Sequence, residues 1–256
     1  MASIVINADD FGLSDGVCKS IRELFDAGAI TSTSLMTAAL GARTRMVDWG
    51  VSDLRGRAGV HLQLTGGSPL SPAAEIPSLV EAATGRFRDP RKSELLPDPG
   101  EVEAEWRRQI EVAIELLGGL PNHLDSHHGM HRREDLFEIY VKLAAELNVP
   151  VRGAAGAIGV RMRSRGIRGS VAIVRDWSGR SLGAQELKRQ VEAKIAEHPS
   201  ESVIEVVVHP GYCDEYLKSV SSLSSAREDE HRGLMELANE GWPTSAGHLP
   251  RPYGSF

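Results

Sequence analysis

The chain has 256 residues, with 41% hydrophobic and 25% charged side chains, which is the composition of an ordinary globular protein. Its formal net charge of −6 argues against sequence-independent nucleic-acid binding, because such binding needs a basic surface. The two cysteines, Cys18 and Cys213, form no CxxC pair, and no signal-peptide pattern precedes the first predicted strand. We therefore expect a cytoplasmic protein without membrane insertion, since no apolar run approaches the roughly 20 residues of a transmembrane helix.

The predicted elements alternate between strands and helices along the chain. Apolar runs predict strands at 4–6, 33–36, 60–64, 123–125 and 203–208, and helical periodicity predicts helices at 16–27, 42–49, 101–117 and 136–147. The third of these helices carries Val102, Trp106 and Ile110 at steps of four, which places an apolar stripe on one face. Strands separated by helices imply parallel pairing through right-handed crossovers, so the pattern predicts a doubly wound sheet or a barrel.

Two stretches interrupt this alternation. Residues 65–99 are rich in Pro, Gly and Ser, with one short helix expected near 77–83, and residues 154–183 are rich in Gly, Arg and Ser. Long loops in a compact domain are usually functional, so in a barrel we expect both near the mouth, where they would shape the substrate site. Plain surface insertions are the alternative, because loops tolerate insertion easily.

The first candidate site follows the first predicted strand, where Asp9 and Asp10 stand side by side in the segment Asn-Ala-Asp-Asp-Phe-Gly. Two adjacent acids at this position cannot both point into the core, and the carboxyl end of a parallel strand is where α/β folds place catalytic groups. A solvated turn is the alternative interpretation, since Asp, Asn and Gly all favour turns.

Histidines supply the other candidates. His61 lies on the third strand, on the same face as Gly59 and Gln63, where a hydrogen-bonded core histidine is the structural alternative. Residues 123–131 hold four of the nine histidines, a density that favours a zinc-type site over a solvated loop. His209 follows the fifth strand at a Pro-Gly turn; its imidazole suits proton transfer near neutral pH, unless it only terminates the strand.

All of these candidates lie at or beside the ends of predicted strands, and such ends converge on one face of a barrel. One Asp and two His then form a facial metal site with open positions, and another Asp and His are left for acid–base chemistry. The four histidines of 123–131 cannot all bind one ion, so some must contact other ligands or the substrate.

Five segments resemble the YdjC-like (ChbG-type) carbohydrate deacetylases, in the order of that family and across nearly the whole chain. The segments are NADDFGL at 7–13, TSTSLM at 31–36, GVHLQL at 59–64, HLDSHH at 123–128 and HPGY at 209–212. The resemblance implies a single domain over 1–256, a distorted (β/α) TIM-like barrel of the carbohydrate deacetylase type, with loop insertions near 65–99 and 154–183. It further implies a metal-dependent hydrolase that removes acetyl groups from N-acetylated sugars of the N-acetylglucosamine type and releases acetate.

The resemblance also implies a role for each site residue. Asp10, His61 and His127 correspond to the metal ligands, Asp9 to the general base, and His209 to the general acid or transition-state stabiliser. The expected cofactor is one divalent ion, zinc first, with magnesium, cobalt or nickel as alternatives. The expected partner is the N-acetylated sugar, and an exposed apolar helix face could support a homodimer.

Three further residues are candidates for contacts with the ligands or the substrate. Asp125 would accept a hydrogen bond from a ligating imidazole or cap a turn. His128 would face the substrate or pack, and Arg152 would hold a sugar, an Asp side chain or a surface salt bridge. One departure from the family stands nearby, because Gly129 replaces the third of three consecutive histidines, which would widen the pocket.

Other functions remain compatible with the same residues. The site could cleave an O-acetyl ester in place of an N-acetyl amide. A non-catalytic sugar-binding barrel is the alternative from another class, although every mapped position of the site is filled. A phosphoesterase would often need two metal ions, and the sequence offers too few assigned ligands for a second one.

Overall fold

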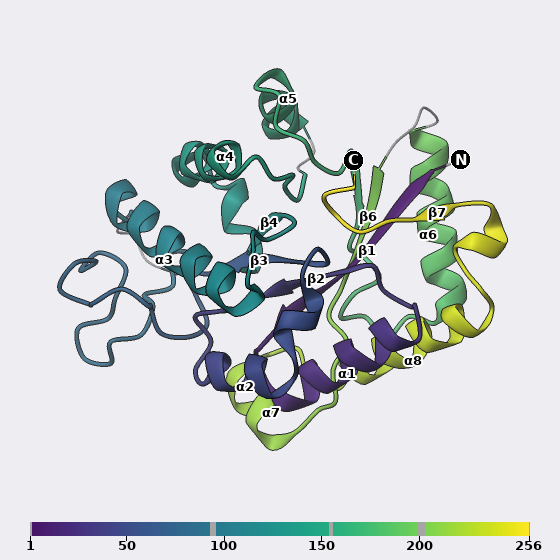
Figure 1. Cartoon of the computed structure of the whole chain (residues 1–256), viewed down its shortest axis with the longest axis horizontal. Coiled ribbons are helices and arrows are strands. Elements are labelled where there is room, and N and C mark those ends of the chain that lie inside the picture. The colour runs from purple at the N-terminus through teal and green to yellow at the C-terminus, as the bar shows by residue number, and fades with distance from the viewer. Residues whose placement is uncertain (1, 93–95, 154–155, 199–202, 256) are drawn as a thin grey trace.

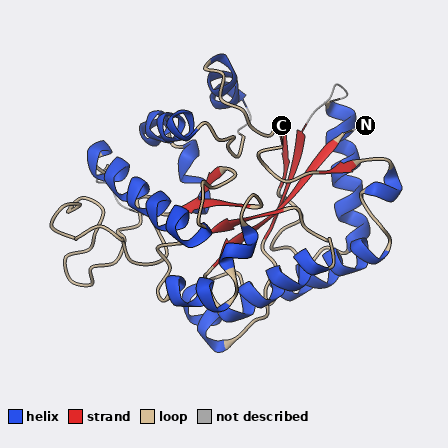
Figure 2. Ribbon diagram, in the orientation of Figure 1, coloured by secondary structure: helices blue, strands red, loops and turns tan. Residues whose placement is uncertain are grey.

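Parallel strands form the centre of the structure, a computed structural model that describes residues 2–92, 96–153, 156–198 and 203–255. The strands are β1 (Ser3–Phe11), β2 (Ser32–Leu35), β3 (Ala58–Leu62), β4 (Leu124–Ser126), β5 (Ala172–Val174), β6 (Val203–Val208) and β7 (Leu249–Pro250). Their order is β4-β3-β2-β1-β6-β5, with β7 on the start of β1, and every pairing is parallel. The sheet curls while helices cover its outer side (Figures 1 and 2).

Two isolated bridges close the curled sheet into a ring. Val151 pairs in parallel with Leu124 of β4 on one side and with Gly169 on the other. Gly169 lies just before β5, and the backbone N–H of Val171 donates to the carbonyl of Val203 at 2.9 Å. The outcome confirms the predicted distorted barrel, in which isolated bridges at Val151 join β4 to the segment before β5.

Eight α-helices are described around the strands: α1 (Asp15–Asp26), α2 (Ala42–Asp48), α3 (Pro99–Leu117), α4 (Glu134–Leu147), α5 (Gly156–Ser164), α6 (Ala184–Glu197), α7 (Glu215–Val220) and α8 (Ala226–Asn239). Short 3-10 turns occupy Val51–Leu54, His127–Arg132 and Thr244–Ala246. No helix in the described ranges is both long and apolar enough to cross a lipid bilayer.

Helix α3 illustrates why these residues fold as they do. Asp98 caps its start by accepting hydrogen bonds from the N–H groups of Gly100 and Glu101, and Pro99 fits the first turn, where its missing N–H costs nothing. Gly118 ends the helix in the left-handed conformation at φ 64°. The apolar stripe faces inward as predicted, with Val102 and Trp106 fully buried against the barrel.

Two sequence-based expectations are wrong in the long interrupting segments. Residues 77–83 form no helix; instead Val80 pairs antiparallel with Phe87, because the polar turn between them folds back on itself. Within 154–183, helix α5 and strand β5 stand where a loop was expected, although residues 154–155 lie outside the described part. Strand β5 is only three residues long, too short for its apolar pattern to appear between Gly, Ser and Arg.

The buried stripe of α3 generates a stability prediction. Truncating Trp106 to Ala should reduce the free energy of unfolding by about 3–5 kcal/mol, because the ring is fully buried and its loss leaves a cavity. Urea unfolding followed by circular dichroism measures the change. The control Leu120→Ala, at a side chain that is 57% exposed, should stay within about 0.5 kcal/mol of the parent. Equal stability of the Trp106 variant and the parent would contradict the assigned packing.

Candidate metal centre and active site

The candidate residues converge at the carboxyl ends of four barrel strands. Asp9 and Asp10 lie at the end of β1, His61 in β3, Asp125 in β4, with His127 following β4 and His209 following β6. All of them except Asp125 line a cavity of about 420 Å³ that adjoins a second cavity of about 420 Å³ at His127 and His128. Segment 65–99 lines the second cavity and segment 154–183 the first, which places parts of both at the mouth, as predicted.

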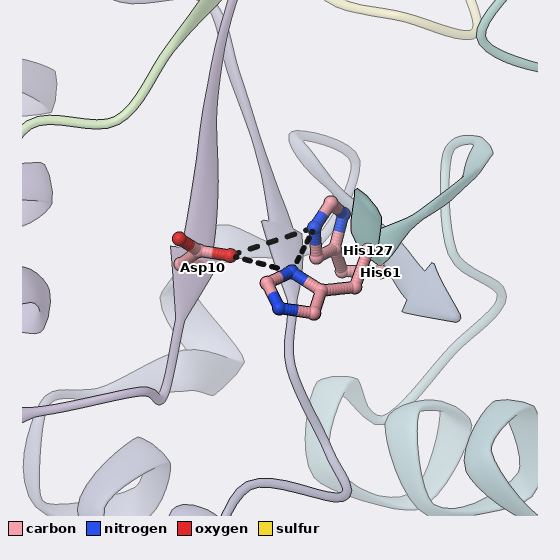
Figure 3. Close-up of side chains that lie close together, drawn as sticks. All are labelled: Asp10, His61 and His127. Atoms are coloured by element: carbon pink, nitrogen blue, oxygen red, sulfur yellow. Dashed lines mark hydrogen bonds and ion pairs between the residues drawn. The ribbon is translucent and has the colours of Figure 1, made fainter. Parts of the chain in front are cut away.

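Asp10, His61 and His127 form a compact triangle of ligand atoms. The Asp10 Oδ1 atom lies 3.4 Å from His61 Nε2 and 3.5 Å from His127 Nδ1. The two ring nitrogens are 3.3 Å apart. Figure 3 shows all three side chains pointing toward one another from three different segments of the chain.

This triangle fits a divalent metal ion. Ligand atoms bound at about 2.1 Å to one tetrahedral or octahedral ion stand about 3.0–3.4 Å apart, close to the observed separations. The Asp10 Oδ1 atom is buried and has no hydrogen-bond partner in the described structure, a costly state that a cation would relieve. Two imidazoles and one carboxylate are a donor set that suits zinc and its neighbours in the transition series.

The backbone turns Asp10 into the site. Strand alternation would point Asp9 and Asp10 to opposite faces, and the sequence argument therefore allowed only one of them inward. The register between β1 and β2 shifts at Ala8–Phe11, and Asp10 adopts the left-handed conformation at φ 73°. Such a conformation is strained for a residue with a Cβ and marks a functional position.

A second contact holds the Asp10 carboxylate. The guanidinium of Arg227, from α8, donates to Asp10 Oδ2 at 2.7 Å, which leaves Oδ1 for the triangle. Burial raises the pKa of Asp10, but the charges of Arg227 and of the nearby His127 outweigh it and hold the pKa well below its ordinary value. Asp10 is therefore ionised, the state a metal ligand needs.

His61 is oriented by the carboxylate predicted to support it. Its Nδ1 atom lies 2.7 Å from Asp125 Oδ1, so Nδ1 carries a proton, and in the neutral ring Nε2 presents its lone pair to the triangle. Asp125 Oδ2 accepts from the Ser34 hydroxyl at 2.9 Å. Burial lowers the pKa of His61, but the negative charges of Asp125, Asp9 and Asp10 raise it to about 9. This cluster of carboxylates thus attracts a cation.

Asp9 is held by Arg152, and the alternative of a surface salt bridge for Arg152 is wrong. The two guanidinium nitrogens donate to the two Asp9 oxygens at 2.8 and 2.6 Å, and Arg152 is only 5% exposed. Asn7 adds a hydrogen bond to Asp9 Oδ1 at 2.8 Å. Burial raises the pKa of Asp9, but Arg152 and His61 lower it overall, so the carboxylate is ionised.

Arg152 also excludes a second ion. Asp9, His61 and Asp125 form another group with metal-ligand spacing. However, the Arg152 guanidinium already lies 2.6 Å from Asp9 Oδ1 and 2.9 Å from Asp125 Oδ2, where a second cation would have to sit. The triangle is thus the better candidate of the two.

His209 faces the same cavity from the other side. Its Nε2 atom is 3.6 Å from Asp9 Oδ2, and a quarter of its side chain is exposed. Its Nδ1 atom is 2.7 Å from the Ser178 hydroxyl oxygen. Asp9 Oδ2 is also 3.9 Å from His61 Nε2, which puts Asp9 between the triangle and His209.

Of the other histidines in 123–131, one lies at the mouth of the cavity and two are buried in the protein. His128 is exposed at the mouth, where its Nδ1 atom bonds the Thr65 hydroxyl at 2.7 Å. His131 bonds Ser126 in the interior, and burial lowers its pKa to about 3. His123 stacks on Tyr253 at 4.1 Å between ring centroids, and burial lowers its pKa to about 4. Burial therefore favours the neutral form of both rings.

Gly129 does not simply widen the pocket, contrary to the expectation. A Cβ there would lie 2.4 Å from the guanidinium of Arg132, so Arg132 occupies the space that a larger side chain would take. At φ 67° the position also favours glycine.

Sequence reasoning missed several residues of the site. Ser34 lies in TSTSLM, one of the five segments that resemble the family. That resemblance was the sequence signal that could have identified Ser34 as a site residue. Arg227 and Glu230 lie in a polar amphipathic helix more than 200 residues from Asp10, and no local pattern distinguishes them from surface charges. Their burial, 2% and 1% exposed, appears only in three dimensions.

Known proteins resemble this chain over nearly its whole length. The sequence profile of a family described as YdjC-like protein matches residues 3–241. A carbohydrate deacetylase from Oceanobacillus iheyensis is 33% identical over 241 residues, which cover 93% of this chain and 98% of the relative. A chitooligosaccharide deacetylase from Proteus mirabilis is 31% identical over 225 residues, covering 84% and 83%. The crystal structure of a protein from Enterococcus faecalis V583, named as a candidate for cellobiose-phosphate cleavage, aligns with a TM-score of 0.87 and 25% identity, covering 99% and 98%.

The triangle predicts the binding of one divalent ion per chain. His61→Ala or His127→Ala should weaken zinc binding more than about 100-fold, because each removes one of three protein ligands. Isothermal titration of chelator-stripped protein measures the affinity and stoichiometry. The control His231→Ala removes an imidazole that bonds Ser20 away from the triangle, and it should bind zinc as the parent does. Full-affinity binding by the His61 variant would place the ion elsewhere.

Proposed function

The chain belongs to the YdjC-like protein family, and from this premise we propose that it is a metal-dependent carbohydrate deacetylase that hydrolyses the acetamide of an N-acetylated sugar. The observation that carries the proposal is the Asp10–His61–His127 triangle flanked by an ionised carboxylate, Asp9, and an imidazole, His209. The names of the relatives from Oceanobacillus iheyensis and Proteus mirabilis support the reaction. Water adds to the acetyl carbon, the carbon–nitrogen bond breaks, and acetate and the free amino sugar leave.

Asp10, His61 and His127 would hold the divalent ion. When bound, such an ion acts as a Lewis acid, polarising the acetyl carbonyl and lowering the pKa of a water molecule. We propose zinc, because two imidazoles and one carboxylate match its preference better than that of magnesium, which favours oxygen ligands. Cobalt and nickel are the alternatives from the same ligand chemistry.

We assign Asp9 as the general base. It lies 3.9 Å from His61 Nε2, beside the triangle, and its carboxylate is ionised and can accept the proton of the attacking water. The two hydrogen bonds from Arg152 fix its position, and Oδ2, which accepts from Arg152 alone, keeps a second lone pair for the proton. Arg152 is therefore a positioning residue for the base, since its nitrogens are bound to carboxylates.

We assign His209 as the general acid. Its Nε2 atom faces the cavity 3.6 Å from Asp9 Oδ2, so acid and base lie close together in the same cavity. The protonated ring would donate to the sugar nitrogen as the carbon–nitrogen bond breaks, which lets the amine leave as a neutral group. His128, Arg132 and Arg175 line the same cavity and are the side chains proposed to contact the sugar.

We also propose a cytoplasmic location and a homodimer. Cys18 and Cys213 are both free, as a reducing cytoplasmic location would require. A homodimer would use exposed apolar side chains such as Val47 on the outer face of α2.

The function is tested by acetate release from N-acetylglucosamine, its β-1,4-linked disaccharide and longer oligomers, with and without chelator. We expect release that stops on chelation and returns with zinc. A parallel series of O-acetylated sugars separates the two reactions, and faster release from esters would favour the esterase alternative. Sugar binding without release from any member, in protein that holds its ion, would favour the non-catalytic barrel.

Asp9→Asn tests the base. Turnover should fall by about 100- to 10,000-fold while zinc affinity stays close to that of the parent, because the amide cannot accept the proton yet lies outside the triangle. Initial rates and titration calorimetry measure the two quantities. The matched control Asp53→Asn, an exposed acid paired with Arg22, should leave both unchanged. If Asp9→Asn turned over at a near-parental rate, Asp9 is not the base.

A further inference from the structure

We propose that Ser178 and Glu230 form a relay that fixes the tautomer and the orientation of the His209 ring. Both are positioning residues, because they act through His209 and not on the substrate. The proposal rests on the proposed function, in which His209 is the general acid. Nothing in the sequence pattern marks either residue, and the relay follows from four contacts in the structure.

The contacts run in a line from the cavity into the protein. His209 Nδ1 lies 2.7 Å from the Ser178 oxygen, and Ser178 lies 2.8 Å from Glu230 Oε1. The same carboxylate accepts the backbone N–H of Gly179 on Oε1 and the backbone N–H of His209 on Oε2, both at 2.6 Å. The Glu230 carboxylate therefore holds His209 in two ways: it contacts the His209 ring through Ser178, and it accepts the backbone N–H of His209 directly.

The proton positions in the His209–Ser178–Glu230 chain of hydrogen bonds follow from which groups can donate. Glu230 is 1% exposed, and its carboxylate accepts two backbone N–H donors, one on each oxygen. The single Ser178 proton must then go to Glu230, so Ser178 can only accept from His209. Consequently the Nδ1 atom of His209 carries a proton, and the lone pair of neutral His209 is on Nε2, which faces Asp9 and the cavity.

Buried contacts fix the segment that carries Ser178. Trp177, next to Ser178, is almost fully buried, and its Nε1–H donates to the carbonyl of Gly183 at 3.1 Å. Its ring packs on Gly233, where a Cβ would approach Trp177 to 3.0 Å. Glu230 and Gly233 lie one turn apart on α8, so one helix face anchors both the turn and the carboxylate.

This arrangement suits a general acid. When Nε2 gains a proton, the His209 ring becomes positively charged. The hydrogen bonds from Nδ1–H to the Ser178 hydroxyl and from that hydroxyl to Glu230 connect this ring to a buried negative charge on the side away from the cavity. The Nε2 proton then leaves with the sugar nitrogen as the carbon–nitrogen bond breaks. The protons on Nδ1 and on Ser178 stay where they are, so the relay orients the ring without transferring a proton itself.

Ser178→Ala is the decisive variant, because it cuts the line and leaves both backbone bonds to Glu230. The expected result is a kcat lowered by about 10- to 100-fold with KM within about twofold of the parent, since orientation of the acid matters at bond cleavage. Ser178→Thr, which keeps a hydroxyl, should restore most of the rate. The matched control is Ser20→Ala, which deletes a hydroxyl 2.8 Å from the Nδ1 atom of His231, away from the cavity, and should keep the parental kcat.

A spectroscopic measurement tests the relay apart from turnover. In zinc-loaded protein labelled with ¹⁵N-histidine, neutral His209 should show the Nδ1–H tautomer, and Ser178→Ala should shift it toward Nε2–H. A parental kcat together with an unchanged tautomer in Ser178→Ala would overturn the relay. Absence of deacetylation by the parent protein would instead reject the proposed function and leave the tautomer result standing.

Discussion

One buried guanidinium holds the acidic mouth of this barrel together. Arg152 binds both oxygens of Asp9, lies 2.9 Å from Asp125, and donates its Nε–H to Glu205 at 2.7 Å. Without a cation among them, buried carboxylates this close would repel one another and take up protons instead of staying ionised. Its neighbour Val151 makes the two bridges that close the ring between β4 and β5. The short segment that joins β4 to the region before β5 therefore also carries the positive charge of Arg152, on which the site depends.

From that ion pair the rest of the site follows in order. Because Arg152 satisfies Asp9 and one oxygen of Asp125, the other Asp125 oxygen is free to orient His61. Arg227 does the same for Asp10 from the opposite side, binding one oxygen and leaving the other for the triangle. Asp9, Asp10 and Asp125 face only two guanidinium groups, Arg152 and Arg227, so at least one negative charge is uncompensated. This excess explains both the raised pKa of His61 and the fit of a divalent ion.

These contacts divide the site between two groups of elements. The segments from β1, β3 and β4 supply the triangle and the base, whereas β6, α8 and the segment between β5 and α6 supply His209 and the residues that hold it. Each reactive side chain has at least one partner that takes no part in the reaction: Arg152 for Asp9, Asp125 for His61 and Ser178 for His209. Such partners preorganise the reacting groups, which is the main way a rigid barrel contributes to catalysis.

The sequence by itself determined the alternation of strands and helices, the buried stripe of α3, and five of the side chains that meet in the cavity. These properties are local, since hydrophobic periodicity and the position of a polar residue at a strand end can be read within about ten residues. Only the tertiary structure decided that the ring closes through a single residue at Val151, that Asp10 turns inward at a positive φ, and that Arg152 fills the space between Asp9 and Asp125. It alone also brought Arg227 and Glu230 of α8 to Asp10 and His209, because long-range packing, not local pattern, determines whether a charged residue on an amphipathic helix meets solvent or a buried partner.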